Sequence, residues 1–83
     1  MMHTFNIITL NQPAVVERLL RVVRHRSFAI HSLTVNAKDE QLTIELSVVG
    51  ERPVEPLFNQ IQKLYDVTNI GVTSSPPTSR IDS

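Results

Sequence analysis

One short run combines the residue types and the position that anion binding requires. The side chain of Asn11 offers a hydrogen-bond acceptor near the predicted start of a helix, and Pro13 fits a first helical turn because it has no N–H to lose. Backbone N–H groups without helical partners gather at such a point and suit a carboxylate. An ordinary helix cap is the commoner meaning of the same pattern. The run consists of Asn11, Gln12, Pro13 and Ala14.

Catalytic and metal-binding patterns are missing from the rest of the sequence. The chain has no cysteine, which excludes a disulfide, a thiol nucleophile and a cysteine-based metal site. His3, His25 and His31 have no Glu or His at ligand spacing, and no serine stands in a nucleophile-elbow context. His31 falls on a predicted strand, where it is either an exposed polar residue or a contact for a partner. We therefore predict no catalytic residue and no metal site.

Length and charge narrow the class of protein further. The 83 residues are enough for one domain, and eight basic residues are balanced by eight acidic ones. A neutral chain lacks the field of a general nucleic-acid binder, so no nucleic-acid partner is expected. The first residues have no basic segment followed by an apolar run, and no window has the roughly 18 apolar residues of a membrane span. We expect a soluble cytoplasmic protein with no membrane association.

The first half of the chain predicts a strand, a helix and a second strand. Residues 4–10 alternate as a strand does, and the apolar side chains that follow have helical spacing. The apolar parity changes within residues 28–36, which predicts a strand that either has a bulge near His31 and Ser32 or starts later. Apolar residues of the predicted helix include Val15, Leu19, Val22 and Val23.

The second half predicts a strand, a helix and a final strand. Residues 42–49 alternate clearly, and residues 54–65 carry an apolar stripe in which Pro56 must lie in the first turn. Residues 66–73 read as the last strand. The order β-α-β-β-α-β predicts a ferredoxin-like α+β fold: a four-stranded antiparallel sheet with two helices on one face. Residues 1–73 would form one domain, and residues 74–83 a flexible C-terminal tail.

Several short matches to a known family follow one another in order along the chain. They are Asn11, Ala14, Arg18, Arg26, Phe28, the run 30–35, the run 42–44 and the run 62–67. On this ordered combination, the chain from about residue 5 to residue 72 resembles an ACT domain, specifically the small regulatory subunit of acetolactate synthase (acetohydroxyacid synthase). The length of the chain and the run 22–26 are similar to the single-domain, isozyme II type of that family.

The resemblance implies a regulatory role without catalysis in this chain. The partner would be the catalytic large subunit, which would carry thiamine diphosphate, Mg²⁺ and FAD and condense pyruvate with a second 2-oxo acid. This chain would bind that subunit, activate or stabilise it, and form a homodimer, as ACT domains commonly pair. Arg18, Arg21 and His31 are the candidate partner-binding residues.

Two departures from the family pattern bear on feedback inhibition. Ala14 stands where valine-responsive members typically have glycine, and Ala29 stands where they typically have asparagine. A Cβ narrows the site, and each lost hydrogen bond costs roughly 0.5–1.5 kcal/mol. Together these changes would weaken valine binding about 10- to 1000-fold. We therefore expect an effector site that has lost most of its affinity for valine. The residues that resemble this site are Asn11, Gln12, Pro13, Ala14, Ala29 and Ile30.

Two alternatives stay open at this point. One is a free-standing ACT domain that binds a different small molecule near Asn11 and Ala14, across a dimer interface. The other is a structural adaptor without any ligand.

Overall fold

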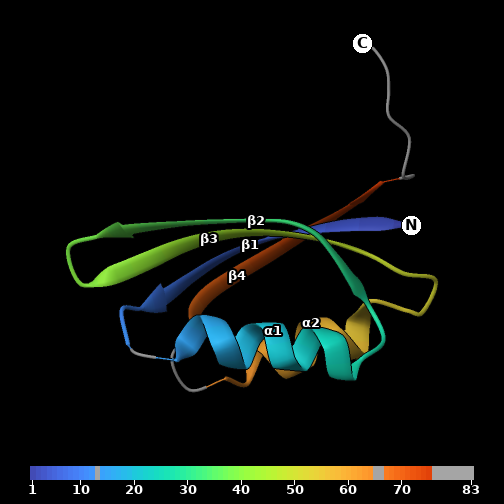
Figure 1. Ribbon diagram of the computed structural model, residues 1–83, viewed down its shortest axis with the longest axis horizontal. Helices are drawn as coiled ribbons and strands as arrows, with labels where there is room; N and C mark the ends of the chain where they lie inside the picture. Colours follow the sequence, from blue (N-terminus) through green and yellow to red (C-terminus); the bar gives the residue numbers. More distant parts are fainter. Residues whose placement is uncertain (13, 65–66, 76–83) are drawn as a thin grey trace, which may run out of the picture.

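The computed structural model describes residues 1–12, 14–64 and 67–75. Its elements follow the predicted β-α-β-β-α-β order (Figure 1). They are β1 (Met2–Leu10), α1 (Val15–His25), β2 (Ala29–Lys38), β3 (Gln41–Val49), α2 (Glu55–Gln62) and β4 (Val67–Ser75). Pro56 lies in the first turn of α2, as predicted, where its missing N–H costs no helical hydrogen bond.

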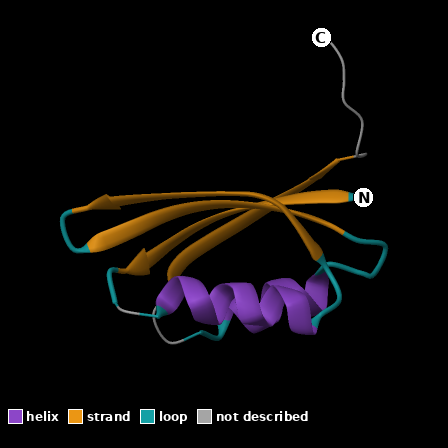
Figure 2. Ribbon diagram, in the orientation of Figure 1, coloured by secondary structure: helices purple, strands orange, loops and turns teal. Residues whose placement is uncertain are grey.

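The four strands form one antiparallel sheet in the order β2-β3-β1-β4. Both helices cover the same face of this sheet, and no helix of the described residues lies on the opposite face (Figure 2). The predicted ferredoxin-like α+β fold is therefore confirmed. The predicted bulge is confirmed too, because the register between β2 and β3 shifts between Ile30 and Ser32. This order leaves β2 and β4 as the two edge strands.

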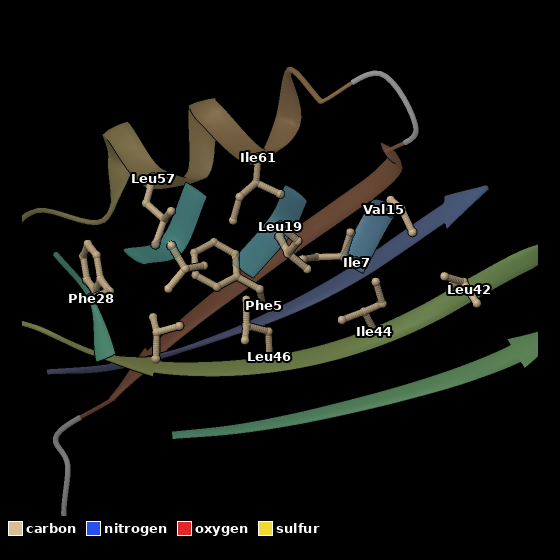
Figure 3. Packing of buried hydrophobic residues seen from close by; sticks show 12 residues of the cluster. Phe5, Ile7, Val15, Leu19, Phe28, Leu42, Ile44, Leu46, Leu57 and Ile61 are labelled. Atoms are coloured by element: carbon tan, nitrogen blue, oxygen red, sulfur yellow. The ribbon is translucent and has the colours of Figure 1, made fainter. Parts of the chain in front are cut away.

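The core lies between the sheet and the two helices (Figure 3). Alternate residues of β1 and β3 point into it, as the period of two requires, and meet the apolar stripes of both helices. Burying one such side chain contributes about 1.5–3 kcal/mol. The buried apolar residues are Phe5, Ile7, Val15, Leu19, Val23, Phe28, Leu42, Ile44, Leu46, Val48, Leu57 and Ile61.

Phe28 closes the core at the end where α1 passes into β2. Ser27 has a positive φ of 66°, which ends the helix and turns the chain, and the N–H of Phe28 donates to the carbonyl of Val23 at 3.2 Å. The ring then packs over Gly50. A Cβ on Gly50 would lie 2.6 Å from Cδ2 of Phe28, so this position needs glycine for space.

Several elements begin or end at residues other than those predicted. Helix α1 begins at Val15, and its N-cap is Ala14, with no side-chain cap, so the predicted cap by Asn11 is wrong. Strand β1 starts at Met2, two residues earlier than predicted, because it pairs along its length with β3. Strand β4 runs to Ser75, two residues into the predicted tail, through pairing with β1. Pro13, residues 65–66 and the predicted tail from residue 76 onward lie outside the described residues.

Candidate effector and docking site

The corner between β1 and α1 is held by backbone hydrogen bonds. The N–H of Asn11 donates to the carbonyl of Glu40 at 2.9 Å, and that of Gln12 donates to Leu10 at 3.0 Å. The N–H of Val15 donates to Gln12 at 3.4 Å. These three N–H groups therefore have partners within the protein and are not left for a carboxylate. The bond to Glu40 also fixes this corner beside the turn between β2 and β3.

Ala14 adopts a left-handed backbone conformation at this corner, with φ 70° and ψ 2°. For an L-residue other than glycine, this conformation costs roughly 1–2 kcal/mol, since Cβ crowds the following carbonyl. Its carbonyl accepts the N–H of Arg18 at 3.0 Å, which forms the first bond of α1. The methyl group of Ala14 is exposed, so it projects from the corner at the place where the effector was expected.

The other two effector-site-like residues lie far from this corner. Ala29 and Ile30 begin β2, at the C-terminal end of α1, whereas Ala14 precedes its N-terminal end (Figure 1). A helix of 11 residues spans about 16 Å. One chain therefore presents two separate groups and not a single pocket. The element order alone could have revealed this, because a strand that follows a helix starts where the helix ends.

The three candidate partner-binding residues do not form one cluster. Arg18 and Arg21 are exposed on α1, and Arg21 lines a shallow hollow of about 410 Å³ together with Glu17, Leu20 and Arg24. His31 is exposed at the bulge of the edge strand β2, outside that hollow.

The sequence did not reveal a pair of side-chain hydrogen bonds between the end of α1 and α2. Nε and Nη2 of Arg26 donate to Oε1 of Gln60 at 3.2 and 2.6 Å. Arg52, in the loop between β3 and α2, lines a hollow with Arg26 and was also missed. No periodic pattern points to Arg52 or Gln60. Only the packing of α1 beside α2 brings them to Arg26.

His3 is buried at the edge of the core. It is buried on β1, its Nδ1 lies 2.6 Å from Oγ of Ser74, and its Nε2 has no partner among the described residues. Its ring stands edge-on to Phe28, with centroids 5.8 Å apart. Burial lowers the pKa of His3, the positive N-terminus lowers it further, and Glu55 opposes both.

The described residues include no group of three or more His, Asp or Glu side chains placed to hold a metal ion. None of their helices is long and apolar enough to cross a membrane.

Comparison with known proteins agrees with the geometry. A family model described as an ACT domain matches residues 11–70. The ACT domain of a GTP pyrophosphokinase from Chlorobium tepidum superposes with a TM-score of 0.76 at 16% identity, covering 88% of this chain and 97% of that domain. The fold and the family model together define an ACT domain.

The curated relatives make the assignment narrower. The acetolactate synthase isozyme 2 small subunit of Escherichia coli K12 is 39% identical over 96% of this chain and 94% of its own length. An acetolactate synthase small subunit of Mycolicibacterium smegmatis is 32% identical over 82% of this chain and 42% of its own length. The chain belongs to the ACT-domain small subunits of acetolactate synthase.

Proposed function

We propose that this chain binds the catalytic subunit of an acetolactate synthase and activates or stabilises it in branched-chain amino acid synthesis. The observation that carries this proposal is the match to the Escherichia coli isozyme 2 small subunit, which spans 96% of this chain and 94% of the relative. Thiamine diphosphate, Mg²⁺ and FAD would all reside on the catalytic partner. This chain would act in the cytoplasm and contribute no reacting group.

Activation by a subunit without catalytic groups has a simple physical basis. A partner that binds the active conformation of the catalytic subunit more tightly than the inactive one shifts the population toward the active form. A tenfold difference in affinity between the two conformations corresponds to about 1.4 kcal/mol. A protein–protein interface of ordinary size can supply this difference in binding free energy between the two conformations.

Co-purification tests the proposal directly. The tagged chain is co-expressed with the catalytic subunit from the same organism, and a tagged ACT domain of unrelated origin serves as the matched control. We expect the catalytic subunit to be retained by this chain and not by the control. Equal retention in both, or none in either, would contradict the proposal. A shift in melting temperature with a small molecule, in the absence of any catalytic subunit, would favour the free-standing effector-binding alternative.

We propose in addition that two copies pair through β2. Support comes from its place at the sheet edge, with unpaired backbone groups along its outer side. Leu33 and Val35 of β2 stay partly exposed, with Val35 at 39%. On α1, Val16 and Leu20 are partly buried against the core. Helical spacing places them on the opposite side of the buried stripe from Val22 and His25, which line a hollow with Gln60 of α2, so they would extend the apolar surface of β2.

Antiparallel pairing of two β2 strands would also assemble the divided effector site. The first residues of one β2 would lie beside the last residues of the other. Those last residues lie near the β1–α1 corner, because Asn11 is bonded to Glu40. Ala29 and Ile30 of one copy would then face Ala14 of its partner. With alanine at both family positions, we propose that this assembled site responds weakly or not at all to valine.

Light scattering after gel filtration tests the dimer. Val35→Lys places a charge on the apolar edge and should yield a monomer, whereas Asn69→Lys on the opposite edge strand should leave the dimer intact. A wild-type monomer at high concentration would contradict the proposal, as would a Val35→Lys variant that stays dimeric.

A further inference from the structure

Two hollows meet at the C-terminal end of α1. The first, of about 160 Å³, is lined by Arg21, Val22, His25 and Gln60, so it lies between α1 and α2. The second, of about 250 Å³, is lined by His25, Arg26, Ser27 and Arg52. Because His25 lines both, the two hollows adjoin each other, and together they are named the basic groove.

The basic groove concentrates positive charge in a chain that is neutral overall. No described acidic residue lines either hollow, and neither Arg21 nor Arg52 forms an ion pair with a described carboxylate. Arg26 is held by Gln60, a neutral amide, so its guanidinium is positioned while its charge stays uncompensated.

Compensation of the α1 dipole explains only part of this arrangement. Arg24 and His25 lie in the last turn, where positive charge is favoured. Arg52, however, comes from the loop before α2, and Arg26 is directed onto α2 by its bonds to Gln60. The groove thus draws cations from separate segments, which a dipole effect on one helix does not require.

We propose that the basic groove docks an acidic segment of the catalytic subunit, an inference that rests on the proposed function. Guanidinium groups match carboxylates in a bidentate geometry, and several arranged along a groove suit successive Asp or Glu side chains. None of the residues that line the groove belongs to β2, so docking and dimerisation would use different residues.

Charge reversal tests this assignment in the full chain with the full catalytic subunit. The variant Arg21→Glu/Arg52→Glu is compared with Lys63→Glu/Asn69→Glu/Thr73→Glu, which makes the same change in net charge outside both the groove and β2. Both variants must melt within a few degrees of the wild type. We expect the groove variant to weaken binding at least about 10-fold at low salt and the control less than about threefold. The difference should shrink in 0.5 M salt, where surface charges are screened.

The possible outcomes separate the two proposals. If the wild type binds the catalytic subunit and both variants bind equally well, the groove assignment is wrong while the proposed function stands. If the wild type does not bind, both fail. If millimolar inorganic phosphate raises the melting temperature of the wild type and the control but not of the groove variant, the groove is a small-anion site, which overturns docking of an acidic segment.

Discussion

Ala14 and Ala29 lie at opposite ends of α1, one just before its first turn and the other at the start of the strand that follows it. Both positions belong to the predicted effector site, yet a single chain separates them by the length of a helix. Any effector site that uses both must therefore draw on two copies of the chain. Occupancy of such a site would depend on dimerisation, and dimerisation would in turn be favoured by an effector.

Replacing Ala14 with glycine should stabilise the protein. Glycine adopts φ 70° without the crowding that Cβ causes, and this gain exceeds its larger loss of backbone entropy. We expect an increase of about 0.5–1 kcal/mol in the free energy of unfolding, measured by urea denaturation. Ala29→Gly, in the extended strand β2, is the control and should bring no gain. A less stable Ala14→Gly variant would show that the left-handed conformation is absent in solution.

Restoring both family residues should create valine binding. In the double variant Ala14→Gly/Ala29→Asn, removal of the methyl group opens the corner and the amide supplies a hydrogen-bonding partner. Calorimetry should detect binding at least about 10-fold tighter than in the wild type. Each single variant serves as a control and should gain less. Micromolar valine binding to the wild type would contradict the proposed insensitivity.

Gly50 and Gly71 form a matched pair for testing the core. Gly50→Ala brings a methyl group to 2.6 Å from Phe28, and the ring must move, which should cost about 1–3 kcal/mol of stability. Gly71→Ala meets nothing within 4 Å on the edge strand β4 and should be neutral or slightly stabilising. Urea unfolding of both variants measures the difference. Equal stability of the two would mean that Phe28 does not pack over Gly50.

Burial of His3 should make stability fall in mild acid. Its folded-state pKa lies below the ordinary value of 6.5, so the unfolded chain takes up the proton more readily. Stability from neutral His3 is therefore complete above about pH 6.5 and is lost as the pH falls toward the lowered pKa. The free energy of unfolding at pH 7.5 and 5.5 measures this loss. His3→Gln should reduce the pH dependence, whereas His31→Gln at an exposed position should retain it. An unchanged slope in His3→Gln would exclude His3 as its source.

Periodicity was sufficient to predict the architecture of this chain. Two apolar patterns each indicate an element with one buried face: the alternation of Leu42, Ile44, Leu46 and Val48, and the helical stripe through Leu57 and Ile61. Burial of that face determines whether the segment forms a strand or a helix. The change of parity near His31 indicated either a bulge or a later strand start, and the register of β2 with β3 shows the bulge. These features depend on local pattern, so the residues alone contain them.

Interactions across the fold were not predictable in the same way. Asn11 has a capping side chain, but the chain turns at Ala14 and the N–H of Asn11 is used by Glu40, a residue of a distant turn. The tie between Arg26 and Gln60 and the position of Arg52 depend on how α1 lies beside α2. The spacing of apolar residues along a helix predicts which of its faces is buried, but not which polar side chains of two helices come into contact.

An activity titration tests the central claim most directly. Purified catalytic subunit at fixed concentration receives increasing amounts of this chain, and acetolactate formation is measured, with an unrelated protein of similar mass as the control. We expect a saturable rise in rate or in the half-life of activity, absent from the control. We also expect Arg21→Glu/Arg52→Glu to shift the midpoint to higher concentration. A rate and a half-life that do not change at any concentration of the wild-type chain would contradict the central claim.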